Sequence, residues 1–460
     1  MNKQLIVRNA GVQTVYQIVS NILGFVFTVV LIKATSQFEF GVYSYIFSTL
    51  VIVNLFIELG IPTYFLRHWS TNPEDFEKER QLLLGTRILL TIPVSILLFI
   101  YVFFIDRFVS LEFLLAYVYF LLDGYLQLNK MFLSARDRFH LTAIIDGSEK
   151  AVAYVGGIAV LLLGGKLLMV FVLFIIGKIV AIALSNIWTG GFKPPKFDLK
   201  KSVQVISKSL PLFMLSVFGI LYFRVDMLII RHLLGVAAVA PYSTAYRLMD
   251  AAVILPGIIL AVSVPTLTKL YADKEDEKLT RSLFLATRYL SVVAFYIAAC
   301  CLLFAKEVML TAFGSDYASA APVLQLFGLT IIVLYLNAPL SYFMYTGRKE
   351  KIHTKVLAFL TILNIGLNLL LIPVFGVEGA ALATLLCELI GFFFLRHFVG
   401  HSLPLRAIVA PALCITVSAL VALLLKPNWI FAAFFMGLIY LLLLFVTRTI
   451  SFKELSFRTK

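Results

Sequence analysis

The chain of 460 residues is 61% hydrophobic and only 14% charged, and its formal net charge at pH 7 is +14. A soluble domain is roughly 45–50% apolar and about 25% charged, so this composition excludes a large soluble domain and favours an integral membrane protein. The positive charge does not call for a nucleic-acid partner, because Lys and Arg gather on the cytoplasmic side of membrane proteins.

Apolar runs that are long enough to cross a bilayer, which takes about 20 residues of helix, recur along the whole sequence. They predict an all-α integral membrane fold with about 14 transmembrane helices. The expected spans cover residues 10–32, 41–66, 83–105, 112–133, 142–163, 167–188, 209–234, 240–267, 283–305, 322–345, 354–374, 377–398, 407–425 and 429–447.

The distribution of basic residues predicts the orientation of the chain. With an even number of spans, 27 of the 39 Lys and Arg residues fall on the side that holds both termini, six fall on the opposite side and six lie inside spans. Because Lys and Arg mark the cytoplasmic side, we expect a multi-pass protein whose two termini are cytoplasmic.

A polar stretch after the sixth span divides the chain. Residues 189–208 contain two prolines and five lysines, which is typical of a linker. We therefore expect an N-terminal six-helix lobe at residues 1–190, a cytoplasmic linker at 191–208, a C-terminal six-helix lobe at 209–398, and accessory helices 13 and 14 with a cytoplasmic tail at 399–460.

Cations inside the spans are the main functional signal, because a central Arg or Asp costs about 2.5–3.5 kcal/mol on insertion scales and usually faces water or a partner. The candidates for a cationic cavity are Lys150, Lys178, Arg224 and Arg247. Two of them have an acid at helical contact spacing, so Asp146 and Lys150, like Arg247 and Asp250, form potential self-neutralising pairs. Arg224 and Lys178 have none, and we expect both to face an aqueous cavity. The alternative is an interhelical salt bridge, for example to Asp123 or Glu58.

Deep carboxylates are the second signal. A buried carboxylate can carry a proton or coordinate Na⁺, and it can equally serve as a counter-ion to a cavity cation. The candidates for ion coupling or charge compensation are Glu58, Asp123, Asp146, Asp226 and Asp250. The four cysteines lie in apolar segments without metal-ligand spacing, so we expect neither a metal site nor a cofactor.

Two stretches resemble a known family. The first is Arg224-Val-Asp226 followed by Leu234-Gly235, Pro241-Tyr242-Ser243 and Ala245-Tyr246-Arg247-Leu248. The second is Thr346-Gly347-Arg348-Lys349 followed by Asn364, Asn368 and the run from Ile372-Pro373 through Gly376, Gly379-Ala380-Ala381 and Ala383-Thr384. They are similar to helices seven and eight and helices ten to twelve of bacterial polysaccharide flippases, the O-antigen and capsule translocases of the multidrug/oligosaccharidyl-lipid/polysaccharide exporter superfamily. The small residues of the second stretch favour close helix approach.

The resemblance implies two six-helix lobes around a V-shaped cavity, an accessory helix pair, and alternating access with H⁺ or Na⁺ coupling. It also implies a polyprenyl-phosphate-linked glycan and membrane lipids as partners, with a polysaccharide polymerase and a chain-length regulator beside them, in the bacterial cytoplasmic (inner) membrane. In the family, cavity cations bind the phosphates of the substrate, and Arg224 and Arg247 match its motif.

The resulting hypothesis is a transporter and not an enzyme: a flippase for a lipid-linked oligosaccharide of lipopolysaccharide O-antigen or capsule type. One alternative is a cation-coupled multidrug or small-molecule exporter of the same superfamily. Another is a membrane glycosyl polymerase or ligase, which needs a catalytic loop outside the membrane. The longest predicted outer loop, residues 306–321, holds only Glu307 and Asp316 as acids, and this argues against that class.

Overall fold

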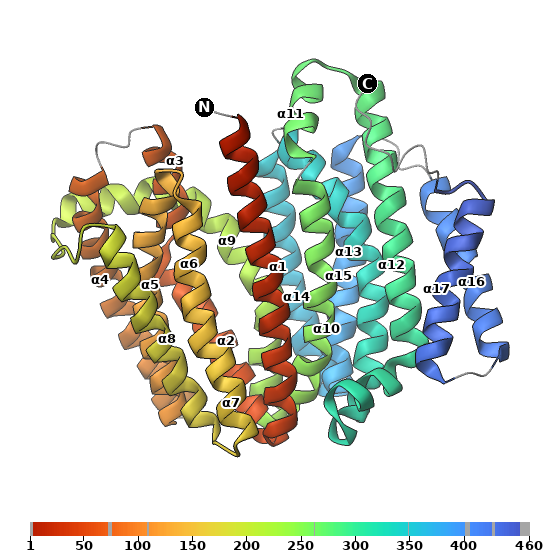
Figure 1. Ribbon diagram of the computed structural model, residues 1–460, viewed down its shortest axis with the longest axis horizontal. Coiled ribbons are helices and arrows are strands. Elements are labelled where there is room, and N and C mark those ends of the chain that lie inside the picture. The colour runs from red at the N-terminus through yellow and green to blue at the C-terminus, as the bar shows by residue number, and fades with distance from the viewer. Residues whose placement is uncertain are drawn as a thin grey trace. The chain divides into compact units, whose positions relative to one another are not determined.

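The computed structural model describes residues 3–71, 76–107, 110–261, 263–347, 349–400, 405–425 and 428–450, and nearly all of these are helical. The described part contains no strand. The chain forms two compact units, Met1–Ala240 and Pro241–Lys460, and Figure 1 shows the helices of each. This division lies about one span later than the predicted linker, and the two six-helix lobes stay a prediction.

Unit 1 is built from nine α-helices in its described part, with two π-helical segments that continue α4 and α6. The helices are α1 (Lys3–Ala34), α2 (Gln37–Glu58), α3 (Ile61–Thr71), α4 (Phe76–Ile100), α5 (Leu111–Ala135), α6 (Phe139–Lys150), α7 (Gly156–Leu162), α8 (Leu167–Trp188) and α9 (Leu199–Leu234), and the π segments are Tyr101–Asp106 and Ala151–Val155.

Helices of unit 1 pack through a dense aromatic and aliphatic core. Aromatic rings from four helices meet around Phe174, which contacts Phe27, Phe47 and Tyr119 at ring-centroid distances of 5.6, 5.9 and 5.7 Å. A second cluster joins α3, α4, α5, α6, α8 and α9 and includes Trp69, which is 1% exposed. These clusters fix α5, α6 and α8 beside one another, which positions the charged residues described below.

Helix α10 (Val236–Ala261) begins in unit 1 and continues into unit 2. The other helices of unit 2 are α11 (Val264–Ala272), α12 (Asp276–Phe313), α13 (Ala321–Thr346), α14 (Glu350–Phe375), α15 (Val377–Val399), α16 (Arg406–Leu425) and α17 (Trp429–Val446), with a short 3₁₀ segment at Ser315–Ala320.

Close packing in unit 2 confirms the role expected for its small residues. A Cβ on Gly379 would lie 2.3 Å from the carbonyl oxygen of Leu371, so only glycine lets α15 approach α14 this closely. The neighbouring Ala380 and Ala381 are fully buried. Helices α16 and α17 pack on each other and on α12, and their role as an accessory pair stays a prediction.

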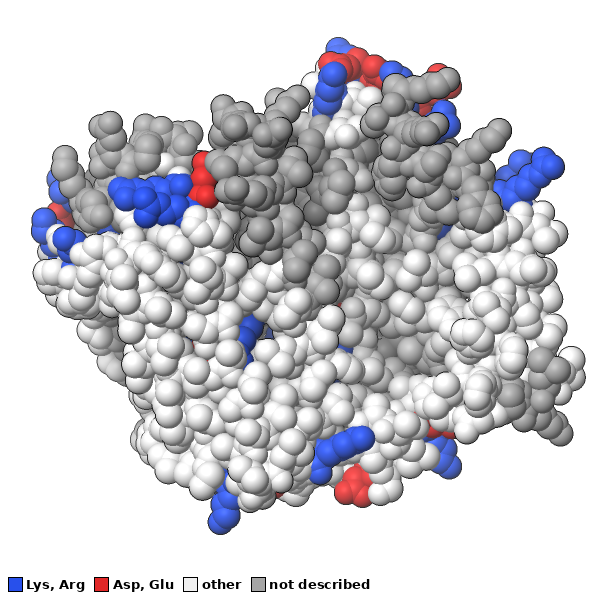
Figure 2. Space-filling model, in the orientation of Figure 1, with Lys and Arg blue, Asp and Glu red and all other residues white. Residues whose placement is uncertain are grey.

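The helices have the length and composition of membrane spans. In the described part, 11 helices qualify, or up to 12 if the bent pair Leu199–Met214 and Ser216–Leu234 is one span. Figure 2 shows a surface that is largely uncharged between the upper and lower edges of the view, where most of the visible Lys and Arg lie. The structure confirms the all-α membrane fold, whereas the count of fourteen spans stays a prediction.

Two predicted elements differ from the structure in their boundaries. The second expected span is broken, because Leu59 and Gly60 take positive φ angles of 42° and 71° and separate α2 from α3. A Cβ on Gly60 would also lie 2.7 Å from the amide nitrogen of Phe213, so the break allows α9 to approach. In addition, α9 starts at Leu199, so the second half of the predicted linker is helical.

Candidate functional site

Lys178 of α8 lies at the centre of a buried charge cluster in unit 1. Its Nζ is 2.7 Å from Oδ1 of Asp123 on α5 and 2.6 Å from Oε1 of Glu149 on α6, and its side chain is 2% exposed. The hydroxyl of Tyr119 donates a hydrogen bond to Glu149 at 3.0 Å, and Gly177 permits the close approach of α8 to the backbone of α6. The prediction that Lys178 faces water is therefore wrong, and the alternative, a salt bridge to Asp123, is what the structure contains.

Arg87 of α4 makes a second interhelical pair. Its Nη2 lies 3.6 Å from Oε1 of Glu58 and donates to Oδ1 of Asn54 at 3.2 Å. Asn54 in turn donates to Glu58 at 3.1 Å. The guanidinium rests on Gly124 of α5, where a Cβ would lie 2.1 Å from it. The absence of a side chain at position 124 thus makes room for a buried cation.

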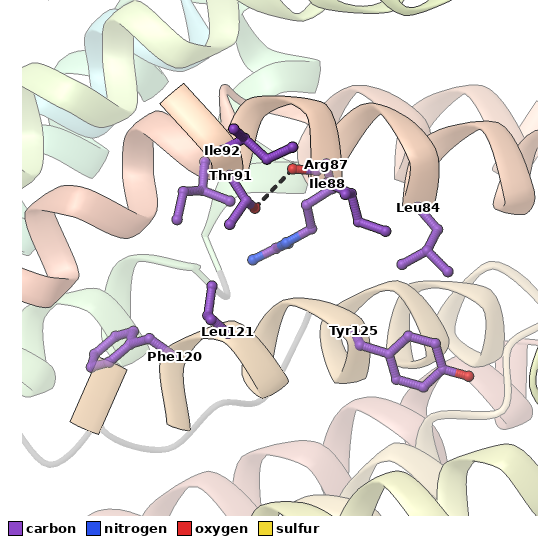
Figure 3. A pocket seen from close by; sticks show the side chains of 9 residues that line it. Leu84, Arg87, Ile88, Thr91, Ile92, Phe120, Leu121 and Tyr125 are labelled. Carbon is purple, nitrogen blue, oxygen red and sulfur yellow. Dashed lines mark hydrogen bonds between the residues drawn. The ribbon is translucent and has the colours of Figure 1, made fainter. Parts of the chain in front are cut away.

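A cavity of about 300 Å³ lies against this guanidinium (Figure 3). Figure 3 shows Arg87 pointing into the space between α4 and α5, with Ile88 and Ile92 on one side and Phe120 and Leu121 on the other. Ile92 is 55% exposed, so the wall is apolar and reaches the molecular surface. Arg87 is consequently paired with Glu58 and Asn54 on one side and borders open space on the other.

Lys150 does not form the ion pair that the sequence predicts. Its expected partner, Asp146, pairs with Lys130 of α5 at 2.6 Å. The ammonium of Lys150 instead lies 5.4 Å from the ring centroid of Tyr16 on α1. Among the described residues no carboxylate lies within ion-pair distance of Lys150, and the self-neutralising pair is not formed because α5 supplies the cation to Asp146.

The remaining predicted residues lie on α9 and α10. In unit 1, Asp226 is 1% exposed and accepts a hydrogen bond from the backbone N–H of Met227 at 2.7 Å, and Arg224 is half-buried. In unit 2, Arg247 and Asp250 are half-buried. The expected pair of these two is not formed, since no carboxylate in the described part of the chain lies within ion-pair distance of Arg247.

Three residues of these interhelical ion pairs were absent from the predicted site: Arg87, Lys130 and Glu149. Arg87 and Glu149 are deep charges in the sequence, so charge inside a span was the signal that pointed to them. Their partners come from other helices, and helical spacing within one segment carries no information about such contacts. Lys130 lies near the end of a predicted span, where its charge looked solvated.

Comparisons with known proteins agree with this picture. The sequence profile of the family described as "Polysaccharide biosynthesis protein" matches residues 6–271. Agl15 of Haloferax volcanii, described as a probable low-salt glycan biosynthesis flippase, is 24% identical over 250 residues, which are 53% of this chain and 52% of that protein, so the match spans about half of that relative. The capsular polysaccharide biosynthesis protein CapF of Staphylococcus aureus is 19% identical over 404 residues, 85% of this chain and 98% of CapF.

Solved structures show the same fold. The lipid II flippase MurJ in an inward closed conformation has a TM-score of 0.78 at 17% identity, over 96% of this chain and 99% of MurJ. An inward-facing multidrug resistance transporter of the MATE family, from the MOP superfamily, has a TM-score of 0.65 at 13% identity, over 83% of this chain and 94% of that one. At these identities the likeness shows the fold alone. The chain is a multi-pass membrane protein with the MOP-superfamily fold, and its profile match shows that it belongs to the polysaccharide biosynthesis protein family.

Proposed function

We propose that this chain is a flippase that moves a polyprenyl-(pyro)phosphate-linked oligosaccharide from the cytoplasmic to the outer leaflet by alternating access through a cationic cavity. Support comes from the family match and from the flippases among its relatives. In this proposal the charged headgroup enters the cavity while the polyprenyl tail stays in lipid.

The proposal rests mainly on the surroundings of two cations, Lys150 and Arg247. Both are half-buried cations, and neither has a carboxylate within ion-pair distance among the described residues. A cation within a spanning helix is costly unless water or an anion meets it, and a phosphate group is such an anion. We therefore assign phosphate binding to Lys150 and Arg247, together with Arg224 from the motif, and assign Lys178 to holding α5, α6 and α8 together.

Ion coupling belongs to the same proposal. The acids Glu58, Asp123 and Asp146 are each tied to a cation of unit 1, so a change in their protonation would loosen a contact between two helices. Asp226 and Asp250 are further candidates on α9 and α10. Coupling to H⁺ or Na⁺ would then act by shifting the equilibrium between the inward and outward states.

Reconstitution tests the function directly. Purified protein in liposomes should move a fluorescent polyprenyl-pyrophosphate-linked sugar to the outer leaflet, where a membrane-impermeant quencher detects it. Lys150→Ala and Arg247→Ala should each lower the rate about tenfold or more, since a charge-assisted hydrogen bond contributes about 1.5–3 kcal/mol. Lys150→Arg should retain most of the rate because it keeps the charge. A wild-type rate equal to that of protein-free liposomes would refute the proposal.

The likeness to a drug transporter of the MATE family supports a second candidate, a cation-coupled multidrug or small-molecule exporter. The same liposomes decide between the two functions. Uptake of an organic cation such as ethidium, driven by a proton or sodium gradient and without movement of the lipid-linked sugar, would favour the exporter.

A further inference from the structure

The first half of α9 runs in a different direction from its second half. The segment Leu199–Met214 is bent by 54° from Ser216–Leu234, which continues the same helix. Pro211 lies just before the bend, and proline removes an intrahelical hydrogen bond and kinks a helix. If Ser216–Leu234 crosses the membrane by itself, the first half leaves the span at this angle and lies at its end, near the membrane surface.

One face of this half-helix is docked on unit 1. Ser202, Val205, Ser209 and Phe213 are buried, and their spacing of three and four residues places them on one stripe. The hydroxyl groups of Ser202 and Thr86 of α4 are 2.7 Å apart and share a hydrogen bond. Because this face is held against the rest of unit 1, the other faces of the half-helix point away from it.

A second face is apolar and exposed. Leu199, Val203, Leu210 and Met214 are 70%, 63%, 42% and 37% exposed. Their spacing of four, seven and four residues places them on a single stripe beside the buried one. Phe192 and Phe197, which lie just before the helix, are 64% and 60% exposed. Water is a poor environment for such a continuous apolar surface.

The third face carries the charge. Lys200, Lys201 and Lys208 are exposed, and at 100° per residue they lie on the side of the apolar stripe opposite the docked face. Gln204 and Ser207 complete this polar face. An apolar stripe with a basic face on one side is typical of helices that lie in a membrane interface, with the apolar side chains among acyl chains and the lysines at phosphate level.

We propose that Leu199–Met214 is an interfacial helix that binds the phosphate headgroups of anionic membrane lipids through Lys200, Lys201 and Lys208. The occupant follows from charge complementarity: the polar face carries three lysines, and the one acid beside it, Asp198, lies 3.7 Å from Lys201 and leaves the face with a net positive charge. The site depends on the chain spanning a membrane and not on its cargo. It therefore stands or falls separately from the proposed function.

Hydrogen–deuterium exchange of the full-length protein in lipid nanodiscs tests the proposal. Peptides covering residues 199–214 should exchange about threefold more slowly with roughly 30 mol% phosphatidylglycerol than in pure phosphatidylcholine, because clustered lysines bind anionic surfaces. The variant K200Q/K201Q/K208Q should lose this difference. The matched variant K269Q/K274Q/K278Q, which removes three exposed lysines from unit 2, should keep it.

The other outcomes overturn the proposal. Equal exchange in both lipid compositions would mean that the lysines do not bind anionic lipid. Equal protection by inorganic phosphate in phosphatidylcholine discs would assign the site to a free anion. Circular dichroism of each variant checks that it is folded, and native mass spectrometry gives an independent readout, with fewer retained phosphatidylglycerol molecules expected for K200Q/K201Q/K208Q than for the matched variant.

Discussion

At the scale of single residues, Lys178 owes its position to two carboxylates on two different helices. Removing an ion pair from water has a large desolvation cost, which mutual attraction offsets only with good geometry and further hydrogen bonds. Here both ion-pair distances are below 3 Å and Tyr119 donates a third contact to Glu149. The cluster is therefore sensitive to the loss of any one member.

We predict that Lys178→Ala destabilises the protein by about 3–5 kcal/mol, because it leaves two buried carboxylates without their cation. The measurement is the apparent melting temperature of the purified protein in detergent. Lys178→Met combined with Asp123→Asn and Glu149→Gln should recover much of the loss, since no charge is then left unpaired. Lys166→Ala, at an exposed position, is the control, and an equal melting temperature for Lys166→Ala and Lys178→Ala would contradict the prediction.

Gly124→Ala should disturb Arg87 without changing any charge. The new Cβ would lie 2.1 Å from the guanidinium, which must move away from Glu58 and Asn54. Overpacking of this kind costs about 1–3 kcal/mol, and thermal unfolding in detergent would report it. Gly366→Ala in α14 is the matched control, because its Cβ would meet nothing within 4 Å, and it should be neutral or slightly stabilising. Equal effects of the two substitutions would argue that Arg87 is free to move.

At the scale of elements, the sequence located the helices better than their ends or partners. Apolar runs predicted the helices because burial in lipid depends on composition. The break at Leu59 and Gly60 was missed, since it depends on the approach of Phe213 from another helix. The partner of Lys178 was left open for the same reason. Lys150 and Asp146 satisfied the local spacing rule, yet a lysine of α5 takes the acid.

The segment after α8 shows how one residue can fix an irregular element. Arg80 of α4 is 3% exposed and donates to the carbonyl oxygens of Thr189 and Gly191 at 2.9 and 3.2 Å, and to Asn129 at 2.8 Å. The backbone N–H of Lys196 also bonds to the carbonyl oxygen of Gln81. These contacts hold residues 189–196 against α4.

We therefore predict that Arg80→Ala releases this segment. Trypsin should cut after Lys196 about tenfold faster than in the wild type, because local opening exposes backbone to the protease. The bond after Lys193 precedes Pro194 and is not a trypsin site. Gel electrophoresis of a digestion time course measures the rate. Arg80→Lys should rescue only in part, since an ammonium cannot reproduce the forked geometry. The exposed Arg281→Ala serves as control, and unchanged cleavage in Arg80→Ala would show that other contacts hold the segment.

At the scale of the whole molecule, the orientation in the membrane follows from the parity of spans. One candidate span, α8, separates Gly164 from Gly190. Two candidate spans, α9 and α10, and the short helix α11 separate Gly190 from Lys274, and α12 separates Lys274 from Gly314. With the cytoplasmic side marked by Lys and Arg, Gly190 and Lys274 should be inside, and Gly164 and Gly314 outside.

Single cysteines at these four positions test the orientation, in a background with the four native cysteines replaced by serine. A membrane-impermeant maleimide should label positions 164 and 314 in intact cells, and positions 190 and 274 only after lysis. Gly164, Gly190 and Lys274 are exposed and Gly314 is half-buried, and the three glycines have no neighbour within 4 Å of a Cβ. Their positive φ angles strain a cysteine, so labelling of all four positions after lysis is the control that lets failure to label in intact cells report the side of the membrane. If positions 190 and 274 were labelled from opposite sides, α9 and α10 could not both cross. The bent helix α9 would then lie at the surface along its whole length, and the cytoplasmic location of the termini would lose its basis.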